Sequence, residues 1–169
     1  DHCTANTIVN YMQLTSYTDP HDDQTGKMDQ AMDARVSIYA DRTAVGDKYV
    51  GMLNGVGTTI AAEIFNDNVS FFGSAMRQQD SPEYIYTAAQ INFDIAEALE
   101  RGWTVPGAGG DAQAHYELGI AMSFDQHGVT DGMLDKDGNL VAGTSLADYM
   151  TNSLVVYNGT REQILTQKW

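Results

Sequence analysis

Three acidic side chains, Asp94, Glu97 and Glu100, follow one another at intervals of three residues in the second half of the chain. On a helix this spacing places neighbouring carboxylates close together, and a carboxylate pair is what a glycoside hydrolase uses as acid and base. The alternative is a solvated helix face on which one carboxylate pairs with Arg101 or caps a neighbouring helix. No other motif supports hydrolysis, so we favour the second interpretation.

The run Asp135-Lys136-Asp137-Gly138-Asn139 begins like the calcium-binding loop of an EF-hand. That loop needs Gly at its sixth position and a bidentate Glu at its twelfth. This chain has Leu140 and Leu146 at those positions, so we expect an ordinary turn.

A second acidic group, Asp19, Asp22 and Asp23 around His21, lies in a loop that also contains Pro and Gly. These side chains could hold a hard cation, but clustered acids in such a loop are usually only solvated. We therefore predict no metal site.

Two histidines, His115 and His127, are too far apart along one expected helix to ligate a metal together without other residues. His127 stands immediately before a glycine, where a helix ends and its dipole favours a positive charge. Cys3 is the single cysteine and cannot form an internal disulfide. No G-x-S-x-G, P-loop, H-E-x-x-H or C-x-x-C motif occurs, so the sequence predicts neither an enzyme nor a cofactor.

Composition excludes several other classes of protein. The 169 residues include 9 Lys+Arg and 23 Asp+Glu, which gives a formal net charge of 9 − 23 = −14. This charge repels phosphate backbones and anionic headgroups, so we expect no nucleic acid partner and no membrane binding through basic patches. The apolar runs, such as Leu154–Tyr157, are far shorter than the ~20 residues of a membrane span. A neutral ligand avoids this repulsion and is therefore the kind of partner that the net charge favours.

The composition and the secondary-structure signals of the sequence change at Ser81-Pro82. Residues 1–80 are rich in Gly, Asn and Asp and predict a loop-rich segment with short helices or strands, among them a helix over 7–14. Residues 81–169 predict helical hairpins. The expected fold is mainly α, with tetratricopeptide-like hairpins beside a loop-rich region.

Helix signals within 81–169 are local and clear. The first helix has Ser81 as N-cap and ends at Arg101-Gly102; the second has Asp111 as N-cap and ends at His127-Gly128. The third runs from Thr144 or Ser145 to Asn158-Gly159. The fourth covers 161–169 behind a capping box of Thr160 and Gln163. We expect the fourth helix, whose apolar Ile164 and Leu165 need a surface to cover, to dock antiparallel on the third helix, with Leu154 and Val155 among its partners.

Short motifs over residues 34–169 agree in order and spacing with those of one known family. They are Ala34–Ala40, Tyr49–Gly55, Ser81–Ile85, Ala96–Trp103, Asp111-Ala112, Tyr116–Phe124, Gln126–Val129 and Glu162–Trp169. On these motifs the chain resembles the SusD/RagB family, the nutrient-binding lipoproteins of Bacteroidota outer membranes. The chain then looks like a piece from the middle to the C-terminal half of such a protein. The resemblance implies that residues 1–80 and 81–169 together form one partial domain, with a loop-rich ligand-side region.

This resemblance implies a binding protein without catalysis. Its members capture oligosaccharide at the cell surface and hand it to a SusC-like TonB-dependent transporter, as part of polysaccharide utilisation. The resemblance implies an outer-membrane location through a lipid anchor that belongs to the parent protein rather than to this piece. Two alternatives stay open: a glycoside hydrolase using a carboxylate pair, and a helical-repeat scaffold that binds no ligand.

Candidate ligand contacts are aromatic residues of the loop-rich half. Neutral sugars present apolar C–H faces, and binding residues are concentrated in loops. The candidates are Tyr39, Tyr49, Phe71 and Phe72.

Four other residues of the matched motifs have expected structural roles: Trp103, Tyr116, Gly119 and Trp169. Trp103 follows the glycine that ends the first helix, so we expect its indole to fold back and bury against Tyr116 or Ile120. Gly119 allows another backbone to approach the second helix closely. Trp169 belongs to the apolar side of the last helix, which needs a surface to cover.

Overall fold

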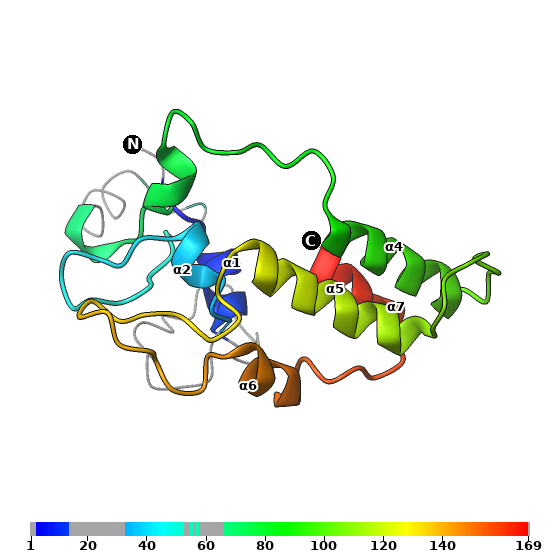
Figure 1. The fold of residues 1–169 in the computed structure, drawn as a ribbon. Coiled ribbons are helices and arrows are strands. Elements are labelled where there is room, and N and C mark those ends of the chain that lie inside the picture. The colour runs from blue at the N-terminus through cyan, green and yellow to red at the C-terminus, as the bar shows by residue number, and fades with distance from the viewer. Residues whose placement is uncertain (1–2, 14–32, 53–54, 56, 58–65, 169) are drawn as a thin grey trace. The chain divides into compact units, whose positions relative to one another are not determined.

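The computed structural model describes residues 3–13, 33–52, 55, 57 and 66–168. Its helices in chain order (Figure 1) are α1 (Asn6–Met12), α2 (Val36–Tyr39), η1 (Asn66–Asn68), η2 (Ser74–Arg77), α4 (Ala88–Glu100), α5 (Ala112–Gln126), α6 (Leu146–Thr151) and α7 (Arg161–Lys168). Within these described residues, extended backbone pairs only as isolated bridges. The mainly α fold expected from the sequence is confirmed.

The backbone divides into two compact units. The first comprises Asp1–Ser81 and Asp131–Tyr149, and the second comprises Pro82–Thr130 and Met150–Trp169. The first therefore contains α1, α2 and the two short 3-10 helices, and the second contains α4, α5 and α7.

The first unit is held together by short extended segments around α1, a helix that the sequence predicted at 7–14. The N–H of Thr4 donates to the carbonyl of Ser70 (2.9 Å), and the N–H of Met52 donates to the carbonyl of Thr4 (2.8 Å). The N–H of Ser70 in turn donates to the carbonyl of Val50 (2.7 Å). Each segment satisfies backbone groups of the others, although none is long enough to form a strand.

A buried ion pair lies at the start of α2. The guanidinium of Arg35, which is 8% exposed, donates from Nε (2.8 Å) and Nη2 (2.6 Å) to the two carboxylate oxygens of buried Asp33. Its Nη2 also donates to the hydroxyl of Tyr149 (3.2 Å), and the guanidinium carbon lies 5.4 Å from the centre of that ring. Burial alone would lower the pKa of Arg35, but the charge and hydrogen bonds of Asp33 outweigh it, so the pKa is raised. The pair fastens α2 to a residue 114 positions away within the same unit.

The start of α4 differs from the sequence expectation. The predicted N-cap at Ser81 is wrong, because α4 begins at Ala88 with Thr87 as N-cap. The Thr87 hydroxyl accepts the N–H of Gln90 (3.1 Å), and the Gln90 side chain accepts the N–H of Thr87 (3.0 Å). This capping box satisfies two N–H groups, whereas the hydroxyl of Ser81 donates to the carbonyl of Ala75.

Both ends of α5 and the end of α4 agree with the sequence. Asp111 caps α5 by accepting the N–H of Ala114 (2.8 Å). After α4, Gly102 has a left-handed backbone (φ 75°), and its N–H donates to the carbonyl of Leu99 (2.9 Å). The N–H of the next residue donates to the carbonyl of Ala98 (3.0 Å). After α5, the N–H groups of Gly128 and Val129 make the corresponding two bonds. Both helices thus end in a Schellman motif.

Helices α4 and α5 form the predicted hairpin (Figure 1). Gly119 faces the ring of Phe93 so closely that an added Cβ would lie 2.7 Å from it. Tyr116 packs edge-on against Phe93 with the ring centroids 6.2 Å apart. The hydroxyl of Tyr116 donates to the carbonyl of Val155 (2.7 Å), so the hairpin core also anchors the chain that follows α6.

The third and fourth helices correct two predictions. Helix α6 ends at Thr151 rather than near Asn158, because the carbonyl of Asn152 accepts the N–H groups of Val155 (2.8 Å) and Val156 (2.9 Å) and closes a turn. Helix α7 packs against α4, not on the third helix as expected. The predicted contact with Leu154 and Val155 is confirmed, because the side chain of Gln163 in α7 donates to the carbonyls of both residues (3.4 and 3.1 Å). Ile164 is fully buried, but Leu165 is 42% exposed.

We predict that Gly119→Ala lowers the free energy of unfolding by ~1–3 kcal/mol, because the new methyl group must displace the Phe93 ring. The direction of the change distinguishes close packing from an open helix face, because on an open face Gly→Ala raises the free energy of unfolding by about 1 kcal/mol. Urea unfolding followed by circular dichroism measures it. Leu118→Ala, on the exposed side of α5, is the matched control. A stabilised Gly119→Ala variant would contradict the close packing.

We predict that Arg35→Met costs about 3–5 kcal/mol of stability, because it leaves the Asp33 carboxylate buried without its partner. Lys136→Met breaks an ion pair whose two side chains are both largely exposed, and it should leave stability unchanged. Chemical denaturation of the two variants compares them directly. Equal stability of the Arg35→Met variant and the wild type would show that the buried pair is not needed.

Candidate functional site

Three backbone segments of the first unit carry all four aromatic candidates. The N–H of Asp41 donates to the carbonyl of Phe71 (2.9 Å), so the segment after Tyr39 lies beside Phe71 and Phe72. The bond from Ser70 to Val50 places the residue after Tyr49 beside the same segment. The structure therefore brings these residues to one part of the unit.

The four rings differ in exposure. Tyr39 and Phe71 are half-buried, whereas Phe72 is 40% exposed. Tyr49 is buried, and the guanidinium carbon of Arg42 lies 5.4 Å from the centre of its ring. Burial raises the pKa of Tyr49, although Arg42 acts in the opposite direction. Phe72 is thus the candidate best placed to meet a ligand.

Charged groups adjoin Phe72 at the start of η2. The guanidinium of Arg77 donates to the Asp41 carboxylate, which also accepts the N–H of Ser74 (2.8 Å). Met76, 49% exposed, lies on η2 itself. We call the set Asp41, Phe72, Ser74, Met76 and Arg77 the η2 corner. It combines an exposed ring with hydrogen-bonding charged side chains, the two kinds of group that a sugar's C–H face and hydroxyls require.

Asp41 and Arg77 were not among the candidates from the sequence. They are 36 positions apart, and nothing in either local segment indicates that they meet. The bridge between Ala40 and Phe72 brings them together.

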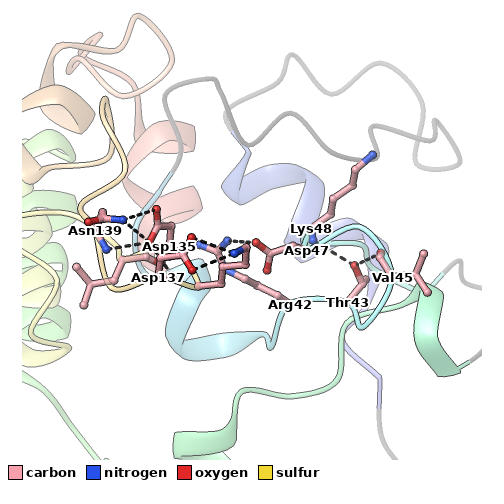
Figure 2. Close-up of polar contacts among 10 residues, drawn as sticks. Arg42, Thr43, Val45, Asp47, Lys48, Asp135, Asp137 and Asn139 are labelled. Atoms are coloured by element: carbon pink, nitrogen blue, oxygen red, sulfur yellow. Dashed lines mark hydrogen bonds and ion pairs between the residues drawn. The ribbon is translucent and has the colours of Figure 1, made fainter.

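A second polar cluster surrounds Arg42 (Figure 2). Its Nη1 pairs with Asp47 (3.2 Å), and its Nη2 donates to the carbonyl of Leu134 (2.8 Å). Arg42 therefore links the turn over 43–48 to the loop that begins at Leu134. Because its guanidinium also covers Tyr49, its role is to order this part of the first unit.

The loop that resembles a calcium site is the turn expected from the sequence. The Oδ1 of Asp135 accepts the backbone N–H groups of Asp137 (2.9 Å) and Asn139 (2.8 Å), as Figure 2 shows. The N–H of Asn139 is the largest influence that lowers the pKa of Asp135. No three His, Cys, Asp or Glu side chains converge as a metal site in the part of the chain that the structure describes. The acidic group at 19–23 lies outside those residues.

The carboxylates of α4 are engaged in ion pairs. Glu97 pairs with Arg101 (2.6 Å) and with Lys168 of α7 (3.2 Å). Asp94 also pairs with Lys168 (2.5 Å), and Glu100 pairs with Arg161 at the other end of α7 (2.9 Å). Helix α7 thus runs antiparallel to α4. The pairing of a carboxylate with Arg101, one of the two alternatives left by the sequence, is observed.

The two histidines serve different contacts. Buried His115 lies between the Asn92 side chain, whose Oδ1 is 2.9 Å from its Nδ1, and the carbonyl of Ala108, 2.9 Å from its Nε2. His127 is the C-cap of α5, and the ring of Tyr84 meets it edge-on at 6.3 Å.

The structure places the four structural-motif residues as follows. Tyr116 and Gly119 lie in the buried contact between α4 and α5. The expectation for Trp103 is wrong, since its side chain is 62% exposed and contacts Arg101, with the guanidinium carbon 5.6 Å from the ring centre. Trp169 lies outside the described residues.

None of the described helices is both long and apolar enough to cross a membrane.

The family described as "Starch-binding associating with outer membrane" matches residues 3–169. The chain therefore belongs to this SusD-like family. A comparison with curated proteins found no match.

Solved structures of SusD homologues resemble the chain. One, from Bacteroides fragilis, is 23% identical with a TM-score of 0.59, over 80% of this chain and 32% of that one. A chitin-binding homologue from Flavobacterium johnsoniae is 26% identical with a TM-score of 0.56, over 80% and 30%. A SusD-like protein from Bacteroides thetaiotaomicron is 29% identical with a TM-score of 0.52, over 80% and 31%. The matched region is thus about a third of each solved chain.

We predict that the contact between α4 and α7 weakens in acid. Burial alone would raise the pKa of Asp94, but hydrogen bonds from Lys168 and Tyr86 outweigh it and lower the pKa below 3.8. The bond from Arg101, followed by that from Lys168, lowers the pKa of Glu97 below 4.5. Groups with a lowered folded pKa contribute fully above the unfolded value and lose their contribution as the pH falls through the folded value. Stability should therefore hold above pH 4.5 and decline below it.

Urea unfolding at a series of pH values measures this decline. In Lys168→Gln the free energy of unfolding should fall less steeply below pH 4.5, since Asp94 and Glu97 both lose a partner. Lys136→Gln removes an exposed ion pair with the adjacent Asp137, which lies in neither α4 nor α7, and should keep the wild-type pH dependence. The same decline of unfolding free energy with falling pH in Lys168→Gln and the wild type would contradict the role of these ion pairs.

Proposed function

We propose that this chain is part of a SusD-like glycan-binding protein. In this proposal the whole protein captures oligosaccharide at the surface of the outer membrane of a Bacteroidota cell, as a lipoprotein, and delivers it to a SusC-like TonB-dependent transporter. The observation that carries the proposal is family membership over residues 3–169, with a description that includes starch binding and outer-membrane association. The chitin-binding homologue supports a glycan as the ligand.

The role is binding without catalysis. The carboxylates of α4, which are the hydrolase candidates from the sequence, are paired with Arg101, Arg161 and Lys168. No cofactor is needed for capture and release of a sugar.

We assign the sugar contact to the η2 corner. Phe72 offers an aromatic face to the apolar side of a sugar ring, while Asp41 and Arg77 offer an acceptor and donors for its hydroxyls. Tyr39 and Phe71, from the paired segments beside it, extend the aromatic character of the region. Tyr49 supports the region from beneath Arg42. A neutral glycan suits a chain with a net charge of −14 better than an anionic one.

Isothermal titration calorimetry against a panel of neutral oligosaccharides, including maltoheptaose and chitohexaose, tests the proposal. The wild-type chain should bind at least one of them. Phe72→Ala should raise the dissociation constant about tenfold, which corresponds to ~1.4 kcal/mol of lost contact. Leu118→Ala removes an equally exposed apolar side chain from α5 and should leave affinity unchanged.

Two results would count against the proposal. Absence of binding to every member of the panel would remove the glycan-binding role. Wild-type affinity in Phe72→Ala would remove the η2 corner as the contact and leave glycan binding itself in place.

A further inference from the structure

Trp103 occupies an unusual position for a large aromatic residue. Its side chain is 62% exposed, although it directly follows α4 and belongs to a unit with a well-packed hairpin core. Its backbone is fixed, because its N–H donates to the carbonyl of Ala98 (3.0 Å) in the Schellman motif behind Gly102. The exposed ring therefore extends from a helix end whose backbone is held by a hydrogen bond.

The indole contacts the side chain of Arg101. The guanidinium carbon of Arg101 lies 5.6 Å from the ring centre, within the range of a cation–π contact. The carboxylate of Glu97 accepts hydrogen bonds from both Nε (3.0 Å) and Nη2 (2.6 Å) of Arg101. Glu97 thereby fixes the guanidinium plane, and the guanidinium in turn orients the ring.

The loop after Trp103 is also attached to the hairpin. Ala108 is the loop residue whose carbonyl lies 2.9 Å from Nε2 of buried His115, a side chain of α5. The other ring nitrogen of His115 contacts Asn92 of α4 (2.9 Å). Both helices therefore contribute to holding the loop that borders Trp103 in sequence.

We propose that Trp103 is a second carbohydrate contact, on which the apolar C–H face of a neutral pyranose stacks, separate from the η2 corner. This inference rests on the proposed function. A fixed, exposed indole supplies the flat apolar surface that such a face needs, and Arg101 supplies N–H donors at its side for the ring hydroxyls.

The charges around the ring select a neutral sugar. The positive charge of Arg101 is balanced by Glu97, and the chain carries a net charge of −14. An anionic sugar would gain little from a guanidinium already paired with a carboxylate, and it would be repelled by the rest of the chain. A neutral sugar avoids this repulsion while keeping the stacking contact.

The test uses tryptophan fluorescence together with calorimetry. The chain has two tryptophans, so Trp169→Phe leaves Trp103 as the only one. Titration of this variant with maltoheptaose or chitohexaose, whichever the wild type binds, should change the intensity and shift the wavelength of Trp103 emission. Trp103→Ala should raise the dissociation constant of this second contact about tenfold, a loss of ~1.4 kcal/mol, and Trp103→Phe should raise it less. Leu118→Ala serves as the matched exposed control.

The outcomes separate this inference from the proposed function. Glycan binding by the wild type, with unchanged Trp103 emission and wild-type affinity in Trp103→Ala, overturns the second contact and leaves the proposed function standing. Reduced affinity without any change in emission shows an indirect effect and also overturns it. No glycan binding by the wild type overturns both. Because the emission measurement leaves Trp103 itself unaltered, it decides the question even where Trp103→Ala fails to fold.

Discussion

The second unit depends on the close approach of α4 and α5 at Gly119. Because this position lacks a side chain, the ring of Phe93 lies directly against the backbone of α5. Tyr116, one turn earlier on α5, then packs against the same ring and uses its hydroxyl to hold the carbonyl of Val155. Gln163 of α7 donates to that carbonyl as well (3.1 Å). A single small residue thus determines how the hairpin, the segment after α6 and α7 fit together.

The first unit is stabilised by a different kind of interaction. Its described extended segments pair only through isolated bridges, so side chains supply part of what a strand ladder would otherwise provide. The buried pair of Arg35 and Asp33 joins α2 to Tyr149, and Arg42 joins the turn at Asp47 to the carbonyl of Leu134. Both arginines also cover a tyrosine ring. Planar guanidinium groups suit this role because they stack and donate several hydrogen bonds at once.

Features governed by neighbouring residues could be predicted from the sequence. The start of α5 at Asp111 and the ends of α4 and α5 at glycines depend on bonds within a few residues. The start of α4 could not be settled locally, because Ser81-Pro82 and the pair of Thr87 and Gln90 are both acceptable helix starts. The helix start at Thr87 is the one observed, and its capping box satisfies one more N–H group than a single N-cap at Ser81 would.

Features that depend on partners distant along the chain could not be predicted from the sequence. The contact of α7 with α4 rests on ion pairs between residues more than sixty positions apart, such as Arg161 with Glu100. Trp103 was expected to fold back over the hairpin because it directly follows the glycine that ends α4. The Schellman motif at that point fixes only the backbone, and the ring stacks on Arg101 instead. The meeting of Asp41 with Arg77 likewise follows from a bridge that no local motif indicates.

The acidity of the chain has a structural explanation that bears on its ligands. Asp111 and Asp135 accept backbone N–H groups at a helix start and a turn, and Asp33 accepts a buried guanidinium. Asp94 and Glu97 hold α7. Carboxylates committed in this way are poor proton donors and poor metal ligands, because each such role would require breaking a bond that the fold uses. The excess of acidic side chains over Lys and Arg gives the chain its net charge of −14, which disfavours anionic ligands.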